Sequence, residues 1–367
     1  MILQAAFLDV FHGDCAVITF EDRGQTRCIV VDGGETKEAA FRLNAWLRHQ
    51  GVRVIDLLVA THIDADHVNG LVHLLASYSQ DEDHWNGGQP ACIRHYWGPL
   101  PDPLWQPPVR SPGPSGWDPL DLPEVSFIAE SVSQNQSLAR LVREHMAEAA
   151  ALVHPSLAEP PSGPLFDSVA LDLLSPDRQV PDTVVGRVPF RWSDAVGLVA
   201  ASGAPLPEDP ARLEELARAG TLFAAAMADR DANNQSIVFR LRPADTGSPA
   251  WSFLFTGDAQ QEAWEMMLQE HPAERLAARV LKAPHHGSYR NGITPEALAV
   301  VTPQVAVISA GQKHGLPDAE MLNLLRGSGE GLLFCTERNN DRRHRGPCGQ
   351  KALCPRRTKR QFRSLLL

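Results

Sequence analysis

Long hydrophobic runs are absent from this sequence of 367 residues. Hydrophobic residues make up 43% of the chain. No stretch, however, approaches the roughly 18 consecutive apolar residues that span a bilayer. The amino terminus also lacks a basic segment followed by an apolar one, which is the pattern of a secretory signal. We therefore expect a cytoplasmic protein without membrane contact.

Paired cysteines are lacking too. No C-x-x-C pair occurs among the six cysteines, which are Cys15, Cys28, Cys92, Cys335, Cys348 and Cys354. Scattered thiols of this kind fit a reducing compartment better than a disulfide framework. His344 lies near the last two cysteines, but the spacing matches no standard zinc pattern, so we expect no metal site there.

Positive charge is scarce over most of the chain. The net charge is −10, which argues against a basic surface that coats nucleic acid. Residues 337–367 are the exception, because they carry ten Lys and Arg against two acidic residues. A basic segment beside an acidic body is typical of a solvated tail or of a segment that binds a polyanion. We therefore expect one domain at 1–336 and a basic carboxy-terminal tail at 337–367.

What the sequence does contain is a series of short apolar runs separated by turn residues. Residues 2–9, 15–20 and 28–31 predict an antiparallel meander, and residues 36–50 predict a helix that ends at Gly51. The later strands are expected at 55–60, 169–174, 237–241, 251–255, 278–283, 305–309 and 331–335, and the later helices at 209–228, 260–270 and 318–325. Strands followed by helices in both halves predict an α+β fold, with two packed sheets and helices outside.

The region from about 79 to 165 has a different character. Nine prolines fall between Pro99 and Glu124, which excludes regular structure there, and a helix is expected at about 132–153. We interpret the region as an insertion that lies over the functional site. Its tryptophans are Trp85, Trp97, Trp105 and Trp117. They are expected to be packing anchors, although one that faces the site could stack on a nucleic-acid base.

The densest group of candidate metal ligands follows the strand at 55–60. His62, Asp64, Asp66 and His67 occupy the turn between this strand and the next helix. Imidazole and carboxylate together suit zinc, manganese or iron. We expect His62 and Asp64 to face one ion, and Asp66 and His67 to face its neighbour. Paired ions suit hydrolysis by an activated water. A helix cap would explain one aspartate but not four such residues.

Three further strand ends carry similar residues. Asp32, Asp258 and the pair His285-His286 each follow an apolar strand beside glycine or proline. We expect Asp258 to bridge two ions and one of the two histidines to complete the second site. Each residue alone is also explained by a turn or a helix cap. Together with the turn at 62–67, they predict a metal centre.

Seven segments carry a family resemblance. They are residues 7–14, 31–34, 61–67 (THIDADH), 233–236, 255–258, 281–288 (LKAPHHGS) and 308–311. In this order they resemble the metallo-β-lactamase fold and, more narrowly, the hydrolase domain of ComEC-type DNA-uptake proteins. The resemblance implies a four-layered αββα sandwich with two divalent metal ions, zinc or manganese, at one edge of the sheets. Without membrane segments, the chain is not expected to form a DNA-importing channel.

Some positions depart from this pattern. Asp64 stands where the general motif has a histidine, and its harder oxygen favours manganese or a mixed site. The separate third-motif histidine has no counterpart, since Asn234 and Ser236 fall in that region. His12 replaces a glutamine of the branch, and Leu316 replaces a histidine. We expect the last two changes to affect substrate contacts and not the metal centre.

These features together predict a metal-dependent hydrolase of phosphodiester bonds, a nuclease that acts on DNA or RNA. Asp66 or Asp258 is expected to orient the attacking water or take its proton. Lys282 is expected to stabilise charge on the phosphoryl oxygens, unless it is a strand-edge lysine that reaches solvent. The candidate substrate contacts are Asp32, Asn234, Ser236 and Ser288.

Two alternatives stay open. One is a hydrolase of a small phosphodiester or another ester, in which the insertion at about 79–165 closes a compact pocket. The other is a module of a larger assembly, for example in defence, whose site is dormant until a protein partner acts. The sequence does not decide between DNA and RNA, between the two metals, or between oligomeric states.

Overall fold

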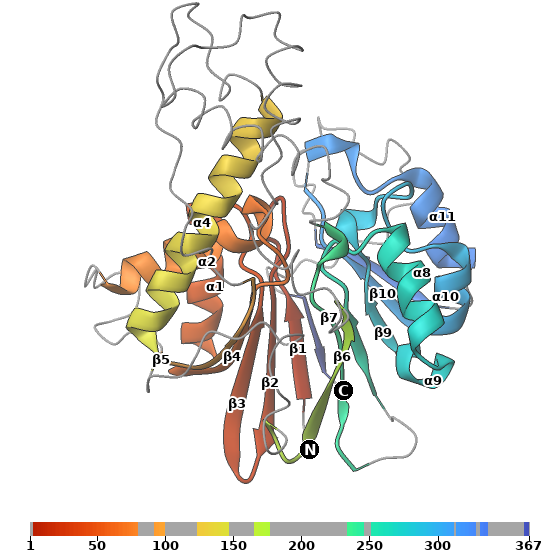
Figure 1. The fold of residues 1–367 in the computed structure, drawn as a ribbon. Helices are drawn as coiled ribbons and strands as arrows, with labels where there is room; N and C mark the ends of the chain where they lie inside the picture. Colours follow the sequence, from red (N-terminus) through yellow and green to blue (C-terminus); the bar gives the residue numbers. More distant parts are fainter. Residues whose placement is uncertain are drawn as a thin grey trace, which may run out of the picture.

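The structure is a computed structural model that describes residues 3–79, 92–99, 123–146, 165–176, 233–245, 251–311, 313–327, 331–336 and 363–366. Two six-stranded sheets pack face to face, and helices cover both outer faces (Figure 1). This is the four-layered αββα sandwich that the sequence predicts.

The first sheet has the strand order β12-β1-β2-β3-β4-β5. Its strands are β1 (Leu3–Phe7), β2 (Ala16–Asp22), β3 (Gln25–Val31), β4 (Val54–Val59), β5 (Cys92–Trp97) and β12 (Arg363–Leu366). The first three form the predicted antiparallel meander, and β3, β4 and β5 are parallel. The helices outside this sheet are α1 (Lys37–His49), α2 (Ala65–Ser79) and α4 (Pro123–His145). Thr36 caps α1, because its hydroxyl accepts from the backbone of Ala39.

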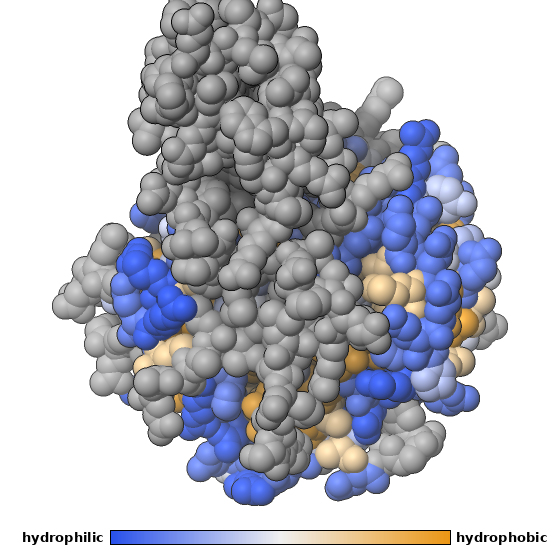
Figure 2. All heavy atoms as spheres, in the orientation of Figure 1, coloured by the Kyte–Doolittle hydropathy of each residue, from blue (hydrophilic) through white to orange (hydrophobic). Residues whose placement is uncertain are grey.

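The second sheet has the order β11-β10-β9-β8-β7-β6. Its strands are β6 (Val169–Ser175), β7 (Val238–Pro243), β8 (Phe253–Phe255), β9 (Val280–Lys282), β10 (Val305–Ile308) and β11 (Leu332–Cys335). Its helices are α8 (Gln261–Glu270), α9 (Ala273–Leu276), α10 (Pro295–Val301) and α11 (Ala319–Gly327), with short 3₁₀ turns η2 (His285–Gly287) and η3 (Lys313–Gly315). The part of Figure 2 that shows these helices is mainly hydrophilic, as expected for an outer layer.

Three apolar layers hold the sandwich together. Between the sheets, Phe255 stacks on Phe7 and Phe239, with ring centroids 6.2 and 5.0 Å apart. Trp46 lies in the core between the first sheet and its helices, and Trp264 in the core under α8. Burying each such side chain contributes about 1.5–3 kcal/mol or more, so the three layers dominate the stability of the fold.

Strand direction places the functional site. The carboxyl ends of β1, β3 and β4 lie at one edge of the first sheet, because β1 and β3 are each antiparallel to β2, and β4 is parallel to β3. In the second sheet, β8, β9 and β10 are parallel. The turn after β4 meets the second sheet directly, since the backbone N–H of Ile237 donates to the carbonyl of Thr61. All loops with candidate ligands therefore come to one edge.

Parts of the predicted insertion belong to the sandwich. β5 forms within the region interpreted as an insertion over the site, because buried Ile93 and Tyr96 extend the sheet. Helix α4 begins at Pro123, earlier than predicted, and packs on α2 (Figure 1). It buries Leu138 and Val142 in the outer core of the first sheet. The remaining residues of the insertion, with Trp85, Trp105 and Trp117, lie outside the described residues, as does the expected helix at 209–228.

The chain end differs from the expectation of a separate tail. The backbone of Arg363–Leu366 pairs antiparallel with β1 as the edge strand β12. Residues 337–362, which include Cys348 and Cys354, lie outside the described part. No disulfide joins the described cysteines. Of the helices that the structure describes, none has the length and apolar character needed to cross a membrane.

The backbone of helix α2 closely approaches the backbone of the turn that follows β3. The N–H of Gly70 donates to the carbonyl of Gly34 at 2.7 Å, and that of Gly33 donates to the carbonyl of His67 at 2.8 Å. A Cβ at Gly70 would lie only 1.9 Å from the carbonyl oxygen of Gly33. Glycine at position 70 is therefore what allows the helix start, and the candidate ligands on it, to sit at the sheet edge.

We predict that Gly70→Ala destabilises the protein, although alanine favours helices. The added methyl group must push α2 away from the β3 turn, at a cost of about 1–3 kcal/mol in the free energy of unfolding. Gly327→Ala, at the end of α11, is the matched control, because a Cβ there meets no atom within 4 Å. It should change stability by less than about 1 kcal/mol. Equal effects of the two variants in urea denaturation would contradict the close-approach argument.

Candidate metal centre

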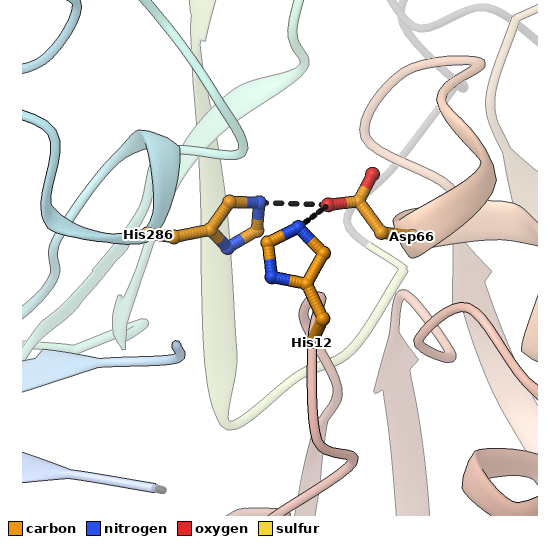
Figure 3. Close-up of side chains that lie close together, drawn as sticks. All are labelled: His12, Asp66 and His286. Carbon is orange, nitrogen blue, oxygen red and sulfur yellow. Dashed lines mark ion pairs between the residues drawn. The ribbon is translucent and has the colours of Figure 1, made fainter. Parts of the chain in front are cut away.

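Most of the predicted ligands converge where the two sheets meet. His62, His67, Asp258 and His286 are buried, and the Asp66 side chain is 17% exposed. Within the described part, three groups of side chains bring their ligand atoms within 4.8 Å of one another. They are His62-His67-Asp258, Asp14-His67-His286 and His12-Asp66-His286. Figure 3 shows the third group, in which two histidines face one carboxylate oxygen.

The carboxylate of Asp32 fixes the orientation of the His67 ring. Its Nδ1 lies 2.9 Å from Asp32 Oδ2, and the same oxygen accepts a hydrogen bond from the Thr61 hydroxyl at 2.8 Å. The other Asp32 oxygen accepts from the Thr61 backbone N–H. A carboxylate on Nδ1 places the proton there, so Nε2 keeps its lone pair for a metal ion. Asp32 therefore sits behind a ligand, in the position of a residue that orients it.

Asp258 lies between two histidines. One of its oxygens is 3.3 Å from Nε2 of His67, and the other is 3.3 Å from Nε2 of His286. Its backbone N–H donates to the hydroxyl of Ser236. Gly257 before it has φ +49°, which glycine adopts without strain. This placement is the one expected of a carboxylate that bridges two ions.

Of the two adjacent histidines, His286 joins the cluster. Its Nδ1 lies 3.0 Å from the carbonyl of Ser309, and its Nε2 lies 2.9 Å from Oδ2 of Asp66. His285 is in none of the three groups. Burial lowers the pKa of His285. The sequence left the choice between the two histidines open, and the geometry favours His286.

Asp64 lies at the rim of the cluster. Its Oδ2 is 3.6 Å from Nε2 of His62, but Asp64 belongs to none of the three groups. His62 instead lies beside His67, with ring centroids 4.1 Å apart. Both predicted pairs of the turn occur as contacts, since His67 Nε2 also lies 3.9 Å from Asp66 Oδ1, but His67 lies closer to Asp258, at 3.3 Å.

Two members of the cluster are not predicted as ligands, since the sequence assigns no role to Asp14 and associates His12 with substrate contacts and not with the metal centre. His12 Nε2 lies 3.2 Å from Asp66 Oδ2, and Asp14 Oδ1 lies 3.4 Å from Nδ1 of His286. Both follow β1, in the stretch between the strands that the sequence predicts at 2–9 and 15–20. The sequence does carry a signal for them. Like the other site residues, they are polar, lie beside a glycine and follow an apolar strand. Only the pairing of β1 with β2 shows that this strand end lies at the site.

The charged side chains of the cluster strongly shift one another's pKa values. Burial alone would raise the pKa of Asp258, yet His286 and His67 hold it well below its usual range. Burial alone would lower the pKa of His67, yet Asp258 and Asp32 raise it well above its usual value. The pKa of Asp66 is also held well below its usual range, against the effect of burial. The site therefore favours positive charge among its carboxylates, which protons or metal cations can supply.

Several buried side-chain atoms of the cluster also remain available to bind a divalent metal ion. Among the described residues, four buried ligand atoms find no hydrogen-bond partner, namely Nε2 of His62, His67 and His286 and Oδ1 of Asp258. An unsatisfied buried polar group costs about 1–3 kcal/mol. Ligands bonded at 2.0–2.1 Å to a tetrahedral ion lie about 3.3 Å apart. The separations of 2.9–3.3 Å around Asp66, Asp258 and the histidines are close to that value.

The other predicted residues support the site from outside the cluster. Lys282 is buried and forms an ion pair with Asp14. The side-chain carbonyl of Asn234 accepts from the backbone of Gln260 and Ala263 at the start of α8. Ser236 holds the backbone of Asp258, and the Ser288 hydroxyl lies 3.4 Å from the N–H of Asn291. Direct contact of any of them with a substrate stays a prediction.

We predict that Asp32→Asn weakens divalent-metal binding by about 10- to 100-fold, the usual effect of losing a carboxylate behind a histidine ligand. Asparagine tolerates the left-handed backbone of position 32, where φ is +57°, so the turn should persist. Calorimetric titration with zinc or manganese measures the affinity, and Asp245→Asn, at an exposed position, is the matched control. Unchanged affinity in Asp32→Asn would show that this carboxylate does not orient His67 for a metal ion.

Comparison with known proteins agrees with this architecture. Residues 8–82 match the family model described as the metallo-beta-lactamase superfamily. This stretch contains the whole turn at 62–67 and ends before Asp258 and His286. No curated protein matches the chain.

Solved structures are similar over most of the chain. One is the metallo-beta-lactamase fold protein YhfI from Bacillus subtilis, with 8% identity and a TM-score of 0.43, covering 91% of this chain and 96% of that one. Another is described as a new diphosphatase from the PhnP family, with 10% identity, a TM-score of 0.37 and coverage of 91% and 95%. No comparison singles out the ComEC-type branch. The chain has the metallo-β-lactamase fold that the sequence predicts.

Proposed function

We propose that this chain is a metal-dependent hydrolase of phosphodiester bonds and that its substrate is a nucleic acid. The observation that carries the proposal is the position of Asp258, which presents one oxygen to each of two buried histidines. A carboxylate shared in this way would serve as a ligand to two neighbouring ions, and paired ions suit in-line displacement at phosphorus. The superfamily match at 8–82 supports the same type of centre.

Two ligand groups would hold the ions. His62 and His67 with Asp258 would hold one ion, with Asp64 at its rim. The second group combines Asp66, His286 and the other oxygen of Asp258. Divalent ions bound there would supply Lewis-acid polarisation of a phosphoryl oxygen and a water of lowered pKa.

The chain's own groups have separate tasks in this proposal. Asp66 is the more exposed carboxylate of the cluster, so it orients the attacking water and accepts its proton. Asp258 is buried and fixes the distance between the two ligand groups. Lys282 is a positioning residue, because its ammonium is held by Asp14 beneath His286. It offsets the negative charge of Asp14.

The substrate class rests on the charge distribution of the sequence. The basic residues at 337–367 provide phosphate contacts that the acidic remainder of the chain does not. That same acidic remainder favours a second candidate, the hydrolysis of a small phosphodiester, because a polyanion is repelled by it. A third candidate is a centre that acts only with a protein partner.

We predict that the purified protein cleaves labelled single- or double-stranded DNA or RNA when manganese or zinc is added. His62→Ala and Asp66→Ala should each reduce the cleavage rate by at least about 100-fold, since they remove a ligand and the proton acceptor. His49→Ala, at the exposed end of α1, is the control and should be fully active. Full metal-dependent activity in Asp66→Ala would contradict the assignment of its role.

The same assay distinguishes the other candidates. Cleavage of bis(p-nitrophenyl) phosphate without cleavage of any polymer would favour the small-substrate hydrolase. Metal binding without either activity would favour the partner-dependent centre.

The basic segment can be tested without removing β12 from the sheet. We predict that replacing Arg338, Arg342, Arg343 and Arg345 with Gln weakens nucleic-acid binding and flattens its salt dependence, by about 0.9 in the log–log slope per lost phosphate contact. Deleting 337–367 would be a poorer test, because it would remove β12 from the sheet. Hydrolysis of bis(p-nitrophenyl) phosphate should not change in the substituted protein. An unchanged salt slope for nucleic-acid binding would contradict a role of these arginines.

A further inference from the structure

His12 reaches the cluster from a loop that the metal-centre proposal does not use. Figure 3 shows it beside His286, with both rings directed at Asp66. The three side chains come from the loop after β1, from the start of α2 and from η2. His12 Nε2 is 3.2 Å and His286 Nε2 is 2.9 Å from the same oxygen, Asp66 Oδ2.

The backbone around His12 is held on two sides. On one side, a Cβ at Gly13 would lie 2.0 Å from the carbonyl oxygen of Asp66, which accepts a hydrogen bond from the N–H of Asp14. On the other side, a Cβ at Gly311 would lie 2.6 Å from the backbone nitrogen of His12. Phe11 has a left-handed φ of +70° in the same loop. A non-glycine residue with a left-handed backbone, such as Phe11, is a recurrent feature of binding sites.

The anchoring of the loop extends to α1. The guanidinium of Arg42 lies 3.9 Å from the centroid of the Phe11 ring and donates to the carbonyl of Asp9. The ring of His12 is therefore presented by a loop with fixed ends. It is 8% exposed, and its Nδ1 has no hydrogen-bond partner among the described residues, so its one polar contact in the structure is through Nε2.

We propose that His12 is a ligand of the second ion, which it binds through Nε2 together with Asp66 and His286. This inference rests on the metal centre of the proposed function and adds a ligand to it. The separations of 2.9 and 3.2 Å from Asp66 Oδ2 are near the about 3.3 Å expected between ligands of one tetrahedral ion.

The added ligand determines the metal preference of that ion. With His12, the ligand group of the second ion gains a second imidazole beside His286. Imidazole nitrogen favours zinc over manganese. His12 therefore shifts the second site toward zinc relative to the same site without this ligand.

Cobalt(II) binding tests the proposal independently of catalysis. The unmodified chain of residues 1–367 is titrated with cobalt. Its metal content after dialysis is counted, and its visible spectrum is recorded. We expect two ions per chain in the unmodified protein. In His12→Gln the second ion should bind at least about tenfold more weakly, since losing even a residue behind a ligand costs that much. His49→Gln is the matched control and should behave like the unmodified protein.

A second variant gives a signal that a purely structural role would not produce. His12→Cys places a thiolate at the proposed ligand position and should add an intense near-ultraviolet sulfur-to-cobalt band. The unmodified protein should lack it, because Cys15 is buried and its pKa is raised well above the usual value by burial. Absence of the band, together with two normally bound ions in His12→Gln, would overturn the proposal.

Failure of the proposed function would look different. If the unmodified protein binds no cobalt, zinc or manganese, the metal centre and the role of His12 are both wrong. If it binds two ions and shows the expected effects at position 12 but cleaves no phosphodiester, His12 remains a ligand and only the proposed function is overturned.

Discussion

The arrangement of this protein depends on the mutual repulsion of carboxylates that meet at one edge of two sheets. They are Asp14, Asp32, Asp66 and Asp258. Like charges repel strongly in an interior of low dielectric, so each needs a positive partner nearby. Lys282 offsets one of them, and the histidines between them offset others only when they are protonated. Two divalent cations would satisfy the group and leave the histidines neutral as ligands.

The fold supplies the framework on which these charges can approach. Parallel strands bring the ends of β3 and β4 together, and two close backbone contacts fix the loops around them. At Gly70 the helix α2 touches the β3 turn, and at Gly13 the loop after β1 touches the backbone of Asp66. Larger residues at either glycine would separate the ligands. The positions of the ligands are therefore determined by backbone packing before any ion binds.

The sequence predicts the repetitive part of this structure well. Strands such as β2 and β4, and the helix at 36–50, follow from apolar periodicity and turn residues. It misses β5, a short strand whose exposed Arg94 and His95 interrupt the apolar pattern, and β12, which lies within a basic segment. Such edge strands form because a neighbouring strand offers free hydrogen-bonding groups, and that is a property of the folded sheet.

The site is predictable where its residues are contiguous, as in the turn at 62–67. The parts that come from distant loops are not, since neither the approach of His12 to Asp66 nor the choice of His286 over His285 follows from spacing. Asp32 shows the same limit. Because Asp32 follows a strand, the sequence predicts that it contacts substrate. Only the folded structure shows that its carboxylate lies behind His67.

Anomalous diffraction at the zinc and manganese absorption edges, from crystals grown with each metal, tests the central claim most directly. The account predicts two peaks per chain. One should contact His62, His67 and Asp258, and the other should contact Asp66, Asp258 and His286. Crystals with bound metal elsewhere but no peak at this cluster would contradict the account, because the carboxylates would then be balanced by protonated histidines and Lys282 alone.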